Sequence, residues 1–310
     1  MRPDAVIEPL STSTVSVRIA SIALLGSLLL WRSVATCADW GLDATTGLTR
    51  NDNLTNAFES RDLKADTAVT ATVAGGVHQQ LSTSTGLGVN LVAEGTQYSR
   101  YEGLDNLGAG ARAQLRTKFG LGPEAPWAAF TARALHRDYR DDLRDGWDYN
   151  AGISVGKQLS DRWSVRGSLG YDAFVADRVS ARGVPGLSTA AYDIDGWTLG
   201  AQAAFRLTEA DLLSGALSWR DGSVTAVTHP DLEVLEYSDA AVIDGTFSDS
   251  NRMIAYRTAA ATRTASLTWS HALGRSTSVN LNYTYRSSRT DHGSGTYVSN
   301  IVSVVLGYSY

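Results

Sequence analysis

Cysteine, proline and positive charge are all scarce in this sequence. The single cysteine among 310 residues, Cys37, excludes an internal disulfide. Only six prolines interrupt the chain, whereas 29 glycines are available for tight turns. The net charge of −5 at pH 7 is opposite in sign to that of a typical nucleic-acid-binding domain, so no nucleic-acid partner is expected.

The apolar content, 43%, is not that of a helical membrane protein, and one apolar run stands out near the N-terminus. Residues 19–31 follow an arginine and precede small residues that end at Ala38, which is the pattern of a secretion signal. The run is shorter than the roughly 20 apolar residues of a membrane-spanning helix. We predict that residues 1–38 are a signal peptide that is removed and that residues 39–310 form one domain. Acylation of Cys37 as a lipoprotein anchor is the alternative.

The chain is rich in short stretches in which apolar and polar residues alternate. In the last one, residues 297–310, Leu306, Tyr308 and Tyr310 share a face with two valines, while the other face is mostly small or polar. A period of two residues is typical of a β-strand. Similar stretches elsewhere carry arginine on their second face, so the apolar face is expected to contact lipid rather than a protein core.

Twelve such stretches follow one another along the chain. An even number suits a closed antiparallel sheet, and the connections alternate between short and mostly longer ones. We therefore predict an all-β fold, a closed antiparallel transmembrane β-barrel of about twelve strands with short periplasmic turns, long extracellular loops and both termini in the periplasm. The stretches lie at about residues 40–49, 66–80, 87–98, 107–119, 128–137, 147–155, 163–175, 197–207, 212–223, 263–269, 278–286 and 297–310.

The tenth stretch is irregular. Arg263 falls on the same face as Leu267 and Trp269, which is the face assigned to lipid. A β-bulge nearby or a shorter lipid-exposed segment is expected there.

A soluble β-sandwich or solenoid would also contain many alternating strands. Two features argue against it. The face opposite the apolar one is too charged to pack against a second sheet. Aromatic residues also recur at strand ends on or near the apolar face, as in the aromatic girdles of membrane barrels. These residues are Trp40, Trp127, Trp147, Tyr149, Trp163, Tyr171, Trp197, Trp219, Trp269, Tyr283, Tyr285, Tyr308 and Tyr310.

Together, the secretion signal, the twelve stretches and the aromatic C-terminus resemble the outer-membrane β-barrel proteins of Gram-negative bacteria. The resemblance covers residues 40–310, and residues 49–53 (TRNDN) and 119–127 (FGLGPEAPW) are similar to segments of uncharacterised barrels of this type. It implies contact with outer-membrane lipid and lipopolysaccharide, and a terminal strand that the barrel assembly machinery recognises. The terminal signal, with tyrosine where phenylalanine is commoner, consists of Leu306, Tyr308 and Tyr310.

If the apolar face contacts lipid, the alternate residues face the interior of the barrel. That interior is cationic in an acidic protein, which favours anions, and a channel for small anionic solutes such as acidic sugars is one interpretation. The other is that the arginines pair with interior acids and fill a narrow barrel. The predicted interior residues are Arg112, Arg116, Lys118, Arg133, Arg137, Arg166, Arg206 and Arg286, with the acids Glu94, Asp148 and Asp172.

Two connections, residues 138–146 and 222–253, are rich in carboxylates. Such clusters could hold calcium or magnesium at the lipopolysaccharide surface, but no EF-hand spacing occurs and solvation is the simpler interpretation. No metal site and no cofactor are predicted.

An enzyme is the competing class. Some outer-membrane barrels that resemble this chain in size hydrolyse lipids with a histidine and a serine at the outer edge of the barrel. Here His292 and Ser294 form the only HxS pair, in a predicted loop and without an evident orienting partner. We predict a non-enzymatic barrel, with lipid hydrolysis or a part in polysaccharide export as alternatives.

Overall fold

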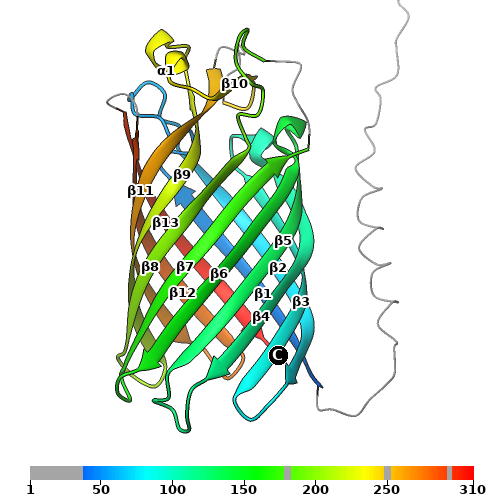
Figure 1. Ribbon diagram of the computed structural model, residues 1–310, viewed down its shortest axis with the longest axis vertical. Coiled ribbons are helices and arrows are strands. Elements are labelled where there is room, and N and C mark those ends of the chain that lie inside the picture. The colour runs from blue at the N-terminus through cyan, green and yellow to red at the C-terminus, as the bar shows by residue number, and fades with distance from the viewer. Residues whose placement is uncertain (1–37, 178–182, 248–252, 292–294) are drawn as a thin grey trace, which may run out of the picture. The chain divides into compact units, whose positions relative to one another are not determined.

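The computed structural model describes residues 38–177, 183–247, 253–291 and 295–310. Apart from Ala38, the predicted signal peptide lies outside these residues, so its removal stays a prediction. No helix in these ranges is long and apolar enough to cross a membrane. The ranges consist largely of β-strands, as the alternation of apolar and polar residues predicts (Figure 1).

Twelve strands of the described residues form a closed antiparallel barrel, which confirms the predicted fold. The first strand, β1, pairs with the last, β13, and β9 pairs directly with β11, so no edge of the ring is left open. The barrel strands are β1 (Ala38–Asn51), β2 (Asp66–Gln80), β3 (Thr85–Tyr98), β4 (Asn106–Lys118), β5 (Trp127–Tyr139), β6 (Gly146–Gln158), β7 (Trp163–Ala176), β8 (Ile194–Arg206), β9 (Asp211–Thr228), β11 (Met253–Ala272), β12 (Thr277–Thr290) and β13 (Thr296–Ser309).

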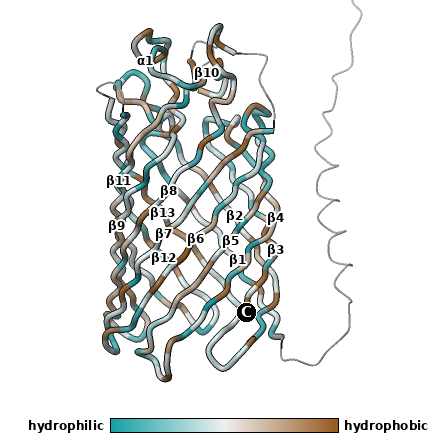
Figure 2. The backbone as a smooth tube through the Cα atoms, viewed as in Figure 1, coloured by the Kyte–Doolittle hydropathy of each residue, from teal (hydrophilic) through white to brown (hydrophobic). Residues whose placement is uncertain are grey.

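The apolar face of every barrel strand lies on the outside. Large apolar side chains are exposed all around the barrel, for example Leu217 of β9 at 66% and Leu199 of β8 at 59%. Figure 2 shows hydrophobic and hydrophilic residues interleaved along the strands. Soluble proteins rarely expose apolar patches above a few hundred Å². A continuous apolar band therefore excludes the soluble sandwich and matches a surface that contacts hydrocarbon.

Aromatic side chains gather near both ends of this apolar band. At one end Tyr171 packs on Trp197, with ring centroids 5.0 Å apart. At the other end Trp163 packs on Phe205, with centroids 4.7 Å apart. These pairs lie where the aromatic girdles of a membrane barrel contact the two lipid–water boundaries.

Two expectations about individual positions are wrong. Trp127 does not belong to a girdle, because it shares the inner face of β5 with Arg133 and its ring lies beneath the guanidinium of Arg116. No β-bulge occurs near Arg263, because β11 pairs with β9 in one unbroken register. Arg263 lies opposite Trp219, exposed on the outer face at the level of the girdle, where a long basic side chain can reach water.

Short turns join the strands at one end of the barrel and mostly longer connections at the other. The register of β1 with β2 and of β12 with β13 puts Ala38 and Ser309 at the short-turn end. The short turns are residues 81–84, 119–126, 159–162, 207–210 and 273–276. The connections at the other end are residues 52–65, 99–105, 140–145, 177–193, 229–252 and 291–295. Those at 99–105 and 140–145 contain the short 3₁₀ helices Glu102–Leu104 and Asp142–Arg144.

The connection after β9 contains two elements that the sequence predicts only as polar loop. A short helix, α1 (Leu232–Glu236), precedes strand β10 (Ala240–Asp244). β10 pairs with residues 253–257 of β11, beyond the point where β12 begins to pair with β11. The longest strands, β9 and β11, therefore extend past their neighbours and carry β10 over the end of the barrel.

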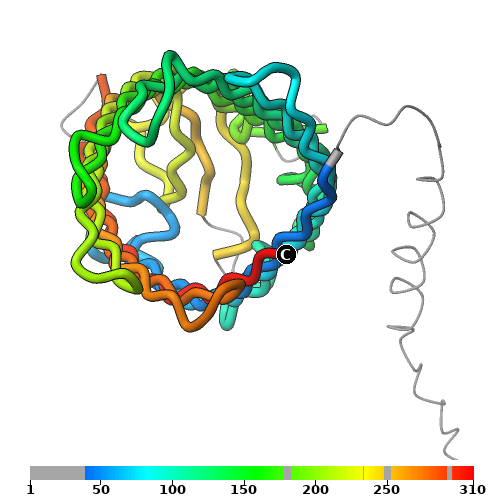
Figure 3. The backbone as a smooth tube through the Cα atoms, turned by 90° about the horizontal axis from the view of Figure 1, so that it is seen from below, coloured from blue at the N-terminus to red at the C-terminus, as the bar shows by residue number. Residues whose placement is uncertain are grey.

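Two connections fold inward at this end, as Figure 3 shows from the opposite end of the barrel. Residues 52–65, here called the inner loop, cross from β1 to β9, where the amide of Val227 donates to the carbonyl of Thr55 at 2.8 Å. Residues 229–247, here called the roof segment, pack with two other connections and with the ends of β9 and β11 into an apolar core. The buried members of that core are Leu104, Ala191, Tyr192, Val227, Ala240, Val242, Phe247, Met253 and Ala255.

Candidate functional site

Basic side chains on the inner face of the barrel form the first candidate site. Arg112 of β4 pairs in register with Arg133 of β5, on the face opposite the exposed Leu115. Arg116 lies with its guanidinium 4.5 Å from the centroid of the Trp127 ring, a cation–π contact. Exposed basic residues of the inner face that form no ion pair with any described residue are here called the basic wall. They are Arg112, Arg116 and Lys118 of β4, Arg166 of β7 and Arg206 of β8.

A second group of predicted interior residues is paired. The side chain of Arg137 forms ion pairs with both Glu94 and Asp148, and its Nη2 atom lies 2.9 Å from Asp148 Oδ2. The Nη2 atom of Arg133 lies 2.8 Å from the same oxygen. These four side chains link β3, β5 and β6 along one side of the inner wall and cancel much of one another's charge. They behave as the filled-barrel interpretation predicts.

Asp172 of β7 is paired as well, with a residue that was not predicted. Arg220 of β9 donates from Nη2 to Asp172 Oδ2 at 2.8 Å and from Nη1 to the carbonyl of Ser223 at 2.9 Å. The sequence does contain a signal for Arg220, because the alternation of β9 puts it on the inner face, one residue after the outward-facing Trp219.

A third cluster holds the roof segment in place. Asp244 of β10 is fully buried and accepts from Arg144 Nη2 at 2.6 Å and from the hydroxyl of Tyr192 at 3.1 Å. The guanidinium of Arg144 also lies 4.5 Å from the Tyr192 ring centroid and 5.6 Å from that of Phe247. The interpretation of Asp244 as a solvated loop acid is therefore wrong. We call Arg144, Tyr192 and Asp244 the roof latch.

In the roof latch, Arg144 keeps its charge and Tyr192 stays neutral over a wide pH range. Burial opposes the charge of Arg144, but Tyr192 and Asp244 raise the pKa of its guanidinium above the usual value. Burial likewise raises the pKa of the Tyr192 hydroxyl, which therefore remains a neutral donor to Asp244. The Nε atom of Arg144 is buried and has no hydrogen-bond partner in the described part of the chain.

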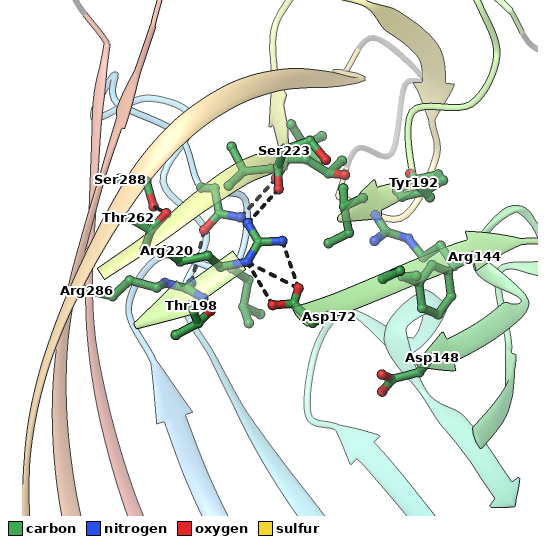
Figure 4. Close-up of a pocket in the computed structure, with 18 of the residues that line it drawn as sticks. Arg144, Asp148, Asp172, Tyr192, Thr198, Arg220, Ser223, Thr262, Arg286 and Ser288 are labelled. Carbon is green, nitrogen blue, oxygen red and sulfur yellow. Dashed lines mark hydrogen bonds and ion pairs between the residues drawn. The ribbon is translucent and has the colours of Figure 1, made fainter. Parts of the chain in front are cut away.

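A cavity of about 590 Å³ lies beneath the roof segment, between the inner loop and the barrel wall. Figure 4 shows side chains from opposite sides of the barrel pointing into it, among them Arg220, Asp172 and Arg286. The predicted Arg286 donates from Nη2 to Asn56 Oδ1 of the inner loop at 3.0 Å and to Ser299 Oγ at 3.3 Å. The cavity therefore brings together paired arginines and one that contacts only neutral groups.

The predicted assembly signal lies on the outer face of the last strand. Leu306 and Tyr308 are each 44% exposed, and the amide of Tyr310 donates to the carbonyl of Leu42 at 2.9 Å. The terminal residues thus extend the β1–β13 seam with their apolar side chains outward. Their recognition by an assembly machinery stays a prediction.

Three of the described histidines pair with carboxylates. His136 pairs with Asp177, His229 with Asp62 and His271 with Asp211, and no serine, threonine or cysteine side chain of the described residues is hydrogen-bonded to any of these three rings. His292 and Ser294 lie outside the described residues. Within the described ranges, no three His, Cys, Asp or Glu side chains have an arrangement that could hold a metal ion.

Solved structures of outer-membrane channels share this architecture. An outer-membrane channel from Pseudomonas putida F1 aligns with a TM-score of 0.54 at 11% identity, over 90% of this chain and 100% of that one. The outer-membrane channel DcaP of Acinetobacter baumannii aligns at 0.42 and 9% identity, over 90% and 99% of the two chains. An anion-selective porin from Comamonas acidovorans aligns at 0.42 and 7% identity, over 89% and 100%. These last two similarities are too weak to bear on function.

No protein-family model and no curated protein sequence matches the chain. At 11% identity, the alignment with the Pseudomonas channel establishes the fold and no activity. The chain therefore has the fold of Gram-negative outer-membrane β-barrel proteins.

Proposed function

We propose that this barrel is an outer-membrane channel through which small anionic solutes diffuse. The basic wall carries the proposal, because its five cations are exposed on the inner face and form no ion pair with the described residues. A surface of one charge sign inside a low-dielectric wall concentrates ions of the other sign. Anions would therefore enter this interior more readily than cations.

Four neighbouring strands line the interior mostly with polar, uncharged groups, which supports a hydrated path. Inner positions of β9, β11, β12 and β13 carry hydroxyl and amide groups rather than carboxylates. An anion beside the basic wall would face neutral hydrogen-bonding groups on these four strands, while the carboxylate of Asp43 on β1 lies on the same inner face. Examples are Ser218, Thr264, Ser266, Thr268, Asn280, Asn282 and Ser303.

A filled barrel without transport is the second candidate. The ion pairs of Arg137 and Arg220 and the inward-folded roof segment favour it, because they occupy the interior near the long connections. The two candidates differ in one measurable property. A filled barrel admits no solute, whereas the channel admits anions faster than neutral molecules of the same size.

The proposal includes an orientation and partners. The short turns and both ends of the barrel chain lie on the periplasmic side, the apolar band contacts outer-membrane lipid, and the long connections lie at the lipopolysaccharide surface. The outward face of β13, with Leu306, Tyr308 and Tyr310, presents the signal for the assembly machinery.

Swelling of lipid vesicles that contain the purified barrel tests the proposed function. D-glucuronate and D-glucose are matched in size and differ mainly by one carboxylate. We expect faster influx of glucuronate, since the basic wall raises its concentration inside the barrel. Vesicles without protein provide the baseline. Equal or faster entry of glucose would refute the anion preference, and no entry of either solute would establish the filled barrel.

A further inference from the structure

Arg286 differs from the other arginines that line the cavity beneath the roof segment. Arg137, Arg144 and Arg220 each have a carboxylate partner within 4.0 Å. Arg286 has none among the described residues, and its two hydrogen bonds both leave from Nη2. Its Nε and Nη1 atoms have no described partner. A guanidinium taken out of bulk water normally has a counter-charge, so this one is incomplete without an anion.

The inner loop fixes the position of this guanidinium. Asn56 accepts from Arg286 through Oδ1 and donates through Nδ2 to the carbonyl of Thr225 on β9 at 2.9 Å. Asn56 is also the only non-glycine residue of the described chain with positive φ, at 48°. A backbone conformation that costs free energy is maintained where the surrounding contacts enforce it. The contacts of Asn56 hold the Arg286 guanidinium at the edge of the cavity.

Hydroxyl side chains from β8, β9, β11 and β12 lie among the residues of the remaining cavity wall. Those of Ser223, Thr225 and Thr262 already bond to Asp195, to the carbonyl of Ala191 and to Ser288. Hydroxyls both donate and accept hydrogen bonds, which suits a ligand that itself carries several hydroxyl groups. The hydroxyl residues of the lining are Thr198, Ser218, Ser223, Thr225, Thr262, Thr264 and Ser288.

From these observations we propose that the cavity is a binding site for a sugar acid with a single carboxylate. The carboxylate pairs with the open Nε and Nη1 side of Arg286, and the sugar hydroxyls bind the hydroxyl-lined wall. One uncompensated cation predicts one negative charge on the ligand. The volume of about 590 Å³ falls within the roughly 300–1,000 Å³ typical of small-molecule sites. This inference rests on the proposed function, since it names a solute class for the same interior.

Equilibrium binding to the purified full-length barrel in detergent micelles tests the site without requiring conduction. Isothermal titration with D-glucuronate is expected to show saturable binding, and D-glucose is expected to bind at least about tenfold more weakly because it cannot pair with Arg286. Arg286→Gln should weaken glucuronate binding by about tenfold or more. Arg263→Gln, which removes a cation from the outer face of the barrel, should leave the affinity within about twofold.

Thr264→Val provides a second variant, because it removes a cavity hydroxyl and keeps Arg286 in place. It should weaken glucuronate binding several-fold. Failure of the site and failure of the channel give different results. Glucuronate entry into vesicles without saturable binding, or unchanged binding by folded Arg286→Gln protein, would overturn the site. Binding that depends on Arg286 in a barrel that admits no solute would support the site and refute the channel.

Discussion

Replacing the four arginines of the basic wall with glutamine is expected to remove most of the anion preference proposed for this barrel. One unit charge on the wall attracts an anion about 8 Å away by roughly 0.5 kcal/mol in water, and by about 2 kcal/mol at the effective dielectric near a protein surface. Four such charges, partly screened by salt, therefore change the ratio of chloride to potassium permeability by about tenfold or more. The ratio follows from the reversal potential of a planar bilayer under a potassium chloride gradient.

A control with the same change in net charge separates the interior from the protein as a whole. Four basic residues lie exposed on the outer parity of their strands and can be replaced by glutamine together. This variant should keep the wild-type reversal potential. An equal loss of selectivity in both variants would contradict a role specific to the basic wall. The control residues are Arg50, Lys157, Arg263 and Arg289.

Removal of the Asp244 carboxylate is expected to release the roof segment. The Asp244→Ala variant leaves Arg144 between two aromatic rings without its counter-charge, and breaking a buried ion pair in this way costs about 3–5 kcal/mol. The twelve barrel strands do not depend on this pair, so the loss should be local. We expect faster proteolytic cleavage within residues 229–247 and a larger single-channel conductance.

Two further variants make this result specific. Asp239→Ala makes the same chemical change at an exposed position of the roof segment and should leave cleavage and conductance unchanged. Replacing Arg144 with Met together with Asp244→Leu should restore protection, because apolar residues of similar size often replace a buried pair without loss. If Asp244→Ala were cleaved no faster than wild type, the roof latch would not hold the segment.

Alternation along single strands was enough to predict the barrel. In β4, apolar residues alternate with Arg112, Gln114 and Arg116, and the requirement that one face contact lipid determines the direction of every side chain. The same rule assigns Trp127 to the inside, since it has the parity of Arg133. The prediction that Trp127 belongs to an aromatic girdle was wrong because it rested on residue type and position at a strand end, not on parity.

The roof and the cavity could not be predicted in this way. Arg144 and Asp244 are 100 residues apart in the chain, and both lie in connections where no periodic pattern assigns a face. The inner loop, which follows β1, likewise reaches Arg286 of β12 past β13, so the contact of that guanidinium with Asn56 depends on the closure of the barrel between β1 and β13. Sequence reasoning found Arg286 itself, but the lack of a carboxylate partner is a property of the folded interior.

The most direct test of the account is the accessibility of two neighbouring residues of β4 in vesicles. With Cys37→Ser as background, Gln114→Cys places a thiol on the inner face and Leu115→Cys places one on the outer face. We expect a charged, membrane-impermeant thiol reagent to label position 114 and not position 115. A fluorophore attached to the thiol at position 115 should instead be quenched by a quencher dissolved in the lipid. Labelling of position 115 from water, with position 114 in contact with lipid, would contradict the assignment of the basic face to the interior.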